Sequence, residues 1–148
     1  MKLIRISETG NLTEEKVVVD DFLRAVIDAT VTHYQRVGFV PPWIGYVGID
    51  GGGVVGVCGF KGAPKDERVE IAYGTAPGHE GKGIATKLAS ELVKIAQSTS
   101  PELTVFAQTL PEMNASTSIL KKLGFRMTCS VDHPEDGLVW EWELERLK

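Results

Sequence analysis

The chain has 148 residues, of which 43% are hydrophobic and 24% charged, a composition that fits one globular domain over residues 1–148. The formal net charge of −4 argues against a nucleic-acid-binding protein, which needs a basic face. No apolar run approaches the roughly 20 residues that cross a bilayer, and the start MKLIRISETG turns polar too early for a signal peptide. We therefore expect a cytoplasmic protein without membrane contact.

The first half of the chain predicts strands around one helix. Residues 2–6 (KLIRI) read as a strand, and apolar residues then recur at helical spacing from Val19 onward. Thr13 with the two glutamates after it supplies a start for this helix, and Gly38 ends it. Residues 43–50 and 54–60 predict a hairpin, because the glycine triplet between them leads into a β-branched run, whereas a phosphate loop leads into a helix.

The second half alternates strands and helices. Residues 68–75 and 103–109 predict strands, separated by a helix over 83–97. NASTSILKKLGF predicts a short helix that Asn114 caps and Gly124 closes, before a hairpin of RMTCSV and LVWEWELE. One face of the last strand is acidic, and we expect it to be solvated. The order β-α-β-β-β-α-β-α-β-β predicts an α+β fold, a mixed sheet with helices on its faces.

The two cysteines do not suggest a metal site. Cys58 and Cys129 are far apart and outside any CxxC pattern, so we expect two reduced thiols in strands and no bound metal.

Glycines gather just before the second long helix, in the stretch APGHEGKGIATKLASELVKIA. A helix N-terminus has unpaired N–H groups and a partial positive charge, and glycines let a ligand approach the backbone closely. Gly81 and Gly83, with Lys82 nearby, therefore predict a phosphate site. The Rossmann fingerprint fails, because Thr86 stands at its third glycine, and no Walker A sequence is present. These failures argue against an unrelated nucleotide-binding protein.

Two segments carry a family resemblance. HEGKGIA resembles the Q/R-x-x-G-x-G/A motif of the GCN5-related N-acetyltransferases (GNAT family), with Glu80 where the family usually has Arg or Gln. TLPEMNASTSILKKLGF resembles the segment that ends the fold, especially in the branch near ribosomal-protein N-acetyltransferases. The resemblance covers about residues 43–144. It implies the GNAT acyl-CoA N-acyltransferase fold and transfer of an acetyl group from acetyl-CoA to a primary amine.

The same resemblance implies a cofactor site. Pantetheine would pair with residues 73–77, the part of the central strand that follows a bulge. A backbone amide of residues 73–75 would polarise the thioester carbonyl, and the pyrophosphate would meet the amides of residues 81–86. For Asn114 and Ser116, helix capping is the alternative to a CoA contact. The implied cofactor-binding residues are Tyr73, Gly74, Thr75, Ala76, Pro77, Gly81, Lys82, Gly83, Ile84, Ala85, Thr86, Asn114 and Ser116.

Glu70 is the candidate catalytic base. It matches the catalytic Glu of the family's histone-acetylating members, and a lysine amine, only about 0.04% neutral at pH 7, needs such a base more than an α-amine that is roughly 15% neutral. A salt bridge or a substrate-positioning role is the alternative for Glu70. Many relatives use a tyrosine of the last helix to protonate CoA, whereas Leu120 or Lys121 stands here.

The acceptor side is the least specified. In the family, the first helix and the last hairpin line the substrate groove, which suggests Tyr34, Trp43 and Tyr46 as substrate-binding residues, with His133 and Trp140 nearby. Trp43 and Tyr46 are equally expected in the core. The acceptor is either a protein N-terminus or a small-molecule amine. A catalytically weak CoA-binding sensor or partner subunit is the alternative function, and pairing of exposed strand edges into a homodimer stays open.

Overall fold

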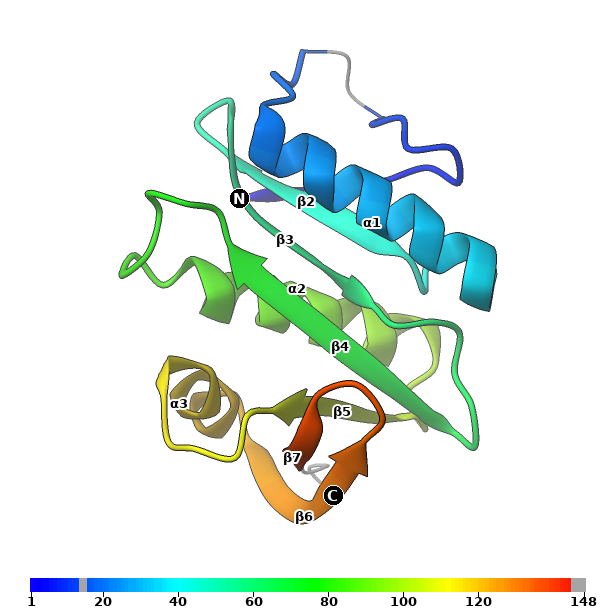
Figure 1. Ribbon diagram of the computed structural model, residues 1–148, viewed down its shortest axis with the longest axis vertical. Coiled ribbons are helices and arrows are strands. Elements are labelled where there is room, and N and C mark those ends of the chain that lie inside the picture. The colour runs from blue at the N-terminus through cyan, green and yellow to red at the C-terminus, as the bar shows by residue number, and fades with distance from the viewer. Residues whose placement is uncertain (14–15, 145–148) are drawn as a thin grey trace.

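Seven strands form one mixed sheet in the order β1-β2-β3-β4-β5-β7-β6 (Figure 1). Among the strands that the structure describes, only β4 and β5 pair in parallel. The computed structural model describes residues 1–13 and 16–144, and no helix within these ranges is long and apolar enough to span a membrane. The predicted element order and the α+β fold are confirmed. The elements are β1 (Lys2–Arg5), α1 (Asp21–Val37), β2 (Gly45–Asp50), β3 (Gly53–Phe60), β4 (Arg68–Thr75), α2 (Ile84–Thr99), β5 (Thr104–Thr109), α3 (Ala115–Lys122), β6 (Phe125–His133) and β7 (Gly137–Leu144).

The first helix begins later than predicted. Asp20 caps α1, because the Leu23 amide donates to its Oδ1 atom at 2.8 Å and so satisfies one of the free amides of the first turn. The predicted start at Thr13 is wrong, and residues 14–15, which belonged to that signal, lie outside the described residues. Gly38 ends α1 as predicted, with a positive φ of 96°.

Different helices cover the two faces of the sheet. A Cβ added at Gly45 would lie 3.0 Å from Thr30 of α1, whereas one added at Gly56 would lie 2.7 Å from Leu88 of α2. Side chains alternate between the faces along a strand. Val69 and Ile71 are therefore buried on the α2 side of the sheet. Glu70, which lies between them, points to the α1 side.

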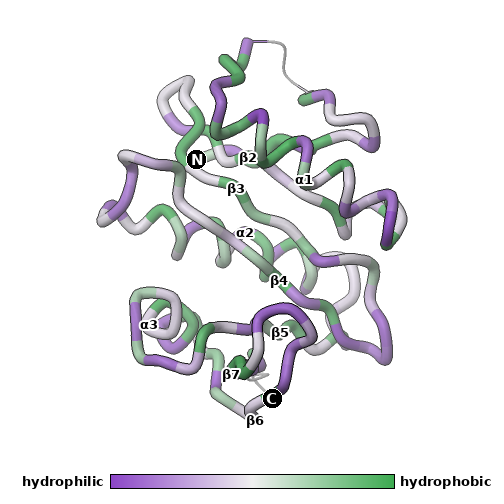
Figure 2. The backbone as a smooth tube through the Cα atoms, in the orientation of Figure 1, coloured by the Kyte–Doolittle hydropathy of each residue, from purple (hydrophilic) through white to green (hydrophobic). Residues whose placement is uncertain are grey.

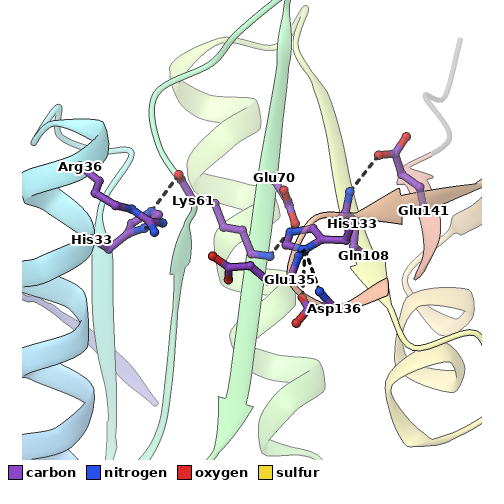
Figure 3. Close-up of polar contacts among 9 residues, drawn as sticks. All are labelled: His33, Arg36, Lys61, Glu70, Gln108, His133, Glu135, Asp136 and Glu141. Carbon is purple, nitrogen blue, oxygen red and sulfur yellow. Dashed lines mark hydrogen bonds and ion pairs between the residues drawn. The ribbon is translucent and has the colours of Figure 1, made fainter. Parts of the chain in front are cut away.

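The acidic face of β7 is not simply solvated, so that prediction is wrong for Glu141. This residue is only 8% exposed. Arg68 donates to its Oε2 atom at 3.0 Å, and Gln108 donates to its Oε1 atom at 3.4 Å, a contact drawn in Figure 3. Burial disfavours the carboxylate, but these hydrogen bonds outweigh it and lower the pKa of Glu141. The Arg68 guanidinium also lies 4.2 Å from the centre of the Phe106 ring. This network joins β4, β5 and β7.

Both cysteines are free thiols in strands, as predicted. Cys58 is buried in β3 and Cys129 is exposed in β6. Burial raises the pKa of Cys58 to about 12, so its thiol stays protonated at neutral pH.

Candidate active site

Strands β4 and β5 are hydrogen-bonded over only the first part of their length. Their pairs run from Arg68–Thr104 to Glu70–Phe106, whereas β4 continues to Thr75 alongside β3. Beyond Glu70 the two strands diverge (Figure 1). The edge of residues 71–75 that faces β5 therefore has no strand partner within the described part of the chain. An extended ligand can pair with such an edge as an added strand.

The divergence from β5, and not a bulge against β3, opens this edge. The pairs between β3 and β4 run without a register shift from Phe60–Ile71 to Gly56–Thr75. The Ala76 amide continues the ladder by donating to the Val55 carbonyl at 2.9 Å. The bulge that the family resemblance implies in the central strand is therefore absent from the pairs between β3 and β4 over residues 71–75.

The loop between β4 and α2 is open to an anion. Gly81 and Gly83 have φ angles of 76° and 74°, a conformation that strains L side chains, and a Cβ added at either would meet nothing within 4 Å. Gly83 is the N-cap of α2, with no side-chain cap and no acidic residue in the first turn. The first amides of α2 therefore lack helical partners, and the positive end of the helix dipole is not masked. This is the geometry that binds phosphate.

The other predicted residues of this loop differ in their exposure to solvent. The carboxylate of exposed Glu80 accepts a hydrogen bond from the Gly78 amide at 3.0 Å, so the side chain folds back onto the start of the loop. Lys82 is exposed at the start of α2. Ala76 and Ile84 are buried, 4% and 5% exposed, so they can reach a ligand chiefly through their backbone.

Helix α3 begins where β4 and β5 diverge, and its first residues make two kinds of contact. Asn114 forms a capping box with Thr117: the Thr117 amide donates to Asn114 Oδ1 at 3.1 Å, and the Asn114 amide donates to Thr117 Oγ1 at 2.9 Å. Asn114 therefore has the capping role that was one of its two predicted alternatives. Ser116 Oγ lies 3.3 Å from the hydroxyl oxygen of Tyr73. Leu120, later in α3, is fully buried.

Glu70 forms an ion pair. Its Oε2 atom lies 2.8 Å from Lys61 Nζ (Figure 3), and the two side chains are 16% and 45% exposed. The same Oε2 atom is buried and makes no hydrogen bond of good geometry, so the contact with Lys61 rests on charge and not on a well-directed N–H···O bond. Glu70 also lines a cavity of ≈530 Å³ with Arg68 and Phe106. Its carboxylate therefore lies at a cavity wall on the α1 side of β4.

A larger cavity of ≈700 Å³ lies between α1, β3, β4 and the turn joining β6 to β7. Lys61 lines both cavities, so the Glu70 ion pair adjoins this space. His33 of α1 donates from Nε2 to the Lys61 carbonyl at 2.9 Å, and Arg36 donates to His33 Nδ1 at 3.5 Å. The β6–β7 turn, which is hydrophilic (Figure 2), contributes Glu135 on the opposite side (Figure 3). The cavity thus has a cationic wall and an acidic one.

Two of the three predicted substrate-binding residues line the larger cavity. These are Tyr34 and Tyr46, whereas Trp43 packs edge to face within the core. The Tyr34 hydroxyl donates to the Ile6 carbonyl at 2.9 Å and accepts from the Gly45 amide at 2.8 Å, so it fastens α1 to the sheet. The Tyr46 hydroxyl also donates to a backbone carbonyl, and burial raises its pKa to about 12.

Of the two remaining candidates near the substrate groove, His133 lines a cavity and Trp140 does not. His133 lines the larger cavity and accepts hydrogen bonds from the amides of Glu135 and Asp136, at 3.1 and 3.2 Å, which closes the β6–β7 turn. Trp140 stacks at an angle beside Trp142 and lines neither cavity.

Sequence reasoning did not single out Lys61 or Arg36. A signal for Lys61 was present: the hairpin register that pairs Phe60 with Ile71 places Lys61 opposite Glu70, where opposite charges attract. Arg36 carries no local signal, because the last turn of a helix is an ordinary place for an arginine.

An open strand edge that leads to an uncapped helix N-terminus, beside a cavity with a carboxylate at its wall, is suited to hold an extended ligand that carries phosphate. The sequence pattern of the Acetyltransferase (GNAT) domain matches residues 13–126. The chain therefore belongs to the GNAT acetyltransferase family, and the resemblance found in its sequence is confirmed.

Solved structures share the fold. An IAA acetyltransferase from Bacillus cereus ATCC 14579 is 19% identical, with a TM-score of 0.66 over 98% of this chain and 99% of that one. YncA from Salmonella typhimurium, a putative acetyltransferase solved with its cofactor acetyl-CoA, is 24% identical, with a TM-score of 0.60 over 86% and 74%. RimL, a ribosomal L7/L12 α-N-protein acetyltransferase solved with CoA, is 15% identical, with a TM-score of 0.63 over 83% and 71%. A comparison with curated protein sequences gave no match.

Proposed function

We propose that this protein is an acetyl-CoA-dependent N-acetyltransferase that moves an acetyl group to a primary amine by direct attack on the thioester. One observation carries the proposal: the unpaired edge of β4 runs directly into a glycine loop and the uncapped N-terminus of α2. An extended pantetheine arm would pair with the strand edge, and a diphosphate would bind the glycine loop and the helix N-terminus. YncA and RimL, which share the fold, were solved with acetyl-CoA and CoA respectively.

The chain can hold the donor mainly through its backbone. The edge of residues 71–75 offers amides and carbonyls to the pantetheine amides, and the amides of residues 81–86 face the pyrophosphate. Exposed Lys82 and Lys87 add positive charge at the start of α2. An amide of Tyr73, Gly74 or Thr75 is suited to polarise the thioester carbonyl, because a fixed N–H group stabilises negative charge that develops on oxygen.

Glu70 is the group best placed to take up the proton of the amine. The amine nitrogen attacks the thioester carbon, a C–N bond forms, the C–S bond breaks, and CoA leaves with the electron pair. The proton lost from nitrogen passes to Glu70 and then to solvent. Glu70 faces the α1 side of β4, beside the cavities, so attack from that side is consistent with its placement.

The acceptor enters through the larger cavity. Its ≈700 Å³ fits a small amine or the first residues of a peptide. An α-amine is roughly 15% neutral at pH 7 and needs less help from a base than a lysine amine does. We therefore propose a protein N-terminus or a small-molecule amine as the acceptor.

Two contacts favour a second candidate, a CoA-binding sensor or partner subunit. Lys61 holds Glu70 in an ion pair, and Glu80 accepts a hydrogen bond from the Gly78 amide. The first contact engages the proposed base, and the second keeps a negative charge in the loop proposed to hold the pyrophosphate.

The two candidates separate in a binding and turnover experiment. A ligand that binds only the folded state raises the melting temperature, so we expect acetyl-CoA and CoA to stabilise the protein and ATP and NAD to have little effect. Stabilisation by ATP without any by CoA would contradict both candidates. Amines are then screened for release of free thiol by the wild type and by Glu70→Gln. Tight CoA binding without turnover of any amine supports the sensor, and an unchanged rate for Glu70→Gln at every pH removes Glu70 from the mechanism.

A further inference from the structure

The reaction needs a group that stabilises the departing sulfur, and α3 does not provide a tyrosine for it. Leu120 is fully buried and Lys121 is exposed on the outer side of the helix. A thiol has a pKa near 8.5, so the thiolate is a tolerable leaving group that a single hydrogen-bond donor can improve. Such a donor has to lie where β4 and β5 diverge, beside the proposed position of the thioester.

Tyr73 supplies a hydroxyl at this place. It lies in the segment of β4 that has left β5, since the last β4–β5 pair is Glu70–Phe106. Side chains alternate along a strand, so Tyr73 points to the face opposite Glu70, toward α2 and α3. Its hydroxyl oxygen lies 3.3 Å from Ser116 Oγ in the first turn of α3. The hydroxyl pair therefore bridges β4 and α3 beside the open edge of the strand.

Glu70 and Tyr73 point to opposite faces of β4. With a thioester at the open edge of this strand, an amine from the acceptor cavity would add to the acyl carbon on the Glu70 side, and the sulfur would leave the tetrahedral intermediate toward α3. Burial raises the pKa of Tyr73, while its hydrogen bond with Ser116 acts in the opposite direction. The phenol consequently keeps its proton at neutral pH and remains a donor.

We propose that Tyr73, oriented by Ser116, donates a hydrogen bond to the CoA sulfur as the carbon–sulfur bond breaks. The bond's electron pair stays on sulfur, CoA leaves as a thiolate, and the thiolate takes its proton from solvent after release. Tyr73 does not lose its own proton in this step. The proposal rests on the proposed function, because it assumes that the thioester lies at the open edge of β4.

A hydrogen bond to the charged form of a group favours that form. If Tyr73 contacts the sulfur, bound CoA therefore prefers the thiolate, and CoA should bind more tightly as the pH rises through the thiol pKa near 8.5. A hydrogen bond to a charged group commonly contributes enough for a gain of about tenfold or more. Desulfo-CoA has no thiol and serves as the matched ligand control.

The test measures the dissociation constants of CoA and desulfo-CoA by calorimetry from below to above this pKa, with the wild type and Tyr73→Phe. We expect the affinity of the wild type for CoA, relative to desulfo-CoA, to rise about tenfold, and the relative affinity of Tyr73→Phe to stay flat. The ultraviolet absorbance of the thiolate should show a lower thiol pKa in wild-type CoA complexes only. With acetyl-CoA, kcat of Tyr73→Phe should fall about 10–100-fold while KM changes little.

Tyr73→Phe keeps the ring and its packing. Should this variant fail to fold, Ser116→Ala retains the phenol but removes its partner, and we expect an intermediate pH dependence from it. A folded Tyr73→Phe or Ser116→Ala protein whose CoA affinity rises with pH as the wild type's does would overturn the proposal and leave the hydroxyl pair with a structural role. If the wild type binds neither CoA nor desulfo-CoA, the proposed function fails, and this inference fails with it for that separate reason.

Discussion

Replacing Gly83 by alanine tests whether the start of α2 is the phosphate site. Its φ of 74° places it in the left-handed region, where a Cβ costs roughly 1–2 kcal/mol of folding free energy. Gly51, in the β2–β3 turn, is a matched control: its φ is 61°, and an added Cβ at either position meets nothing within 4 Å. Both variants should therefore lose similar stability, and each kcal/mol corresponds to a melting-temperature decrease of about 2–4 °C for a chain of this length.

Only the Gly83→Ala variant should lose affinity for CoA. The new methyl group would stand at the N-cap of α2, beside the first amides of the helix, which the proposed phosphate site requires. A hydrogen bond to a charged group contributes about 1.5–3 kcal/mol, so losing one weakens CoA binding about 10–100-fold. Calorimetry well below both melting temperatures measures this. Equal CoA affinities for Gly83→Ala and Gly51→Ala would refute the phosphate site at α2.

Three further outcomes follow from other contacts. Glu141→Gln should cost about 1–3 kcal/mol in the free energy of unfolding, because it removes the carboxylate 3.0 Å from Arg68 and leaves that of Glu143, at 4.0 Å. Since folding lowers the pKa of Glu141, the stabilisation is present above the unfolded-state pKa and is lost as the pH falls through the folded-state pKa. Denaturation curves of variant and wild type should therefore converge in acid. Gly56→Ala should cost about 1–3 kcal/mol in thermal unfolding, because its Cβ would lie 2.7 Å from Leu88 of α2 and 2.8 Å from the Gly74 carbonyl oxygen of β4. Unchanged stability would contradict this close packing around Gly56. Lys61→Met removes the cation that is paired with Glu70 and should lower the acceptor KM. The decrease should be no more than about fivefold, because the ion pair is partly exposed. The KM of acetyl-CoA should stay unchanged, whereas a raised acceptor KM would show that Lys61 helps to bind the acceptor.

Local sequence signals determined the order of the elements and the loop that precedes α2. The period of apolar residues distinguished helices from strands, and the cap at Asn114 and the glycines at 81 and 83 marked helix ends that the structure confirms. The start of α1 was misplaced because Thr13 is also of a residue type that caps helices, whereas Asp20 is the cap in the structure.

Only the tertiary structure decided which side chains meet. Glu141 contacts Arg68 across 73 positions of the chain, and Ser116 reaches Tyr73 across 43. The alternation along β7 showed that Glu141 shares a face with other acids, but whether that face is solvated depends on what β4 and β5 place against it. The opening of β4 likewise depends on where its pairing with β5 stops. Periodicity and capping are properties of neighbouring residues, whereas strand divergence and ion pairs are set by the packing of distant elements.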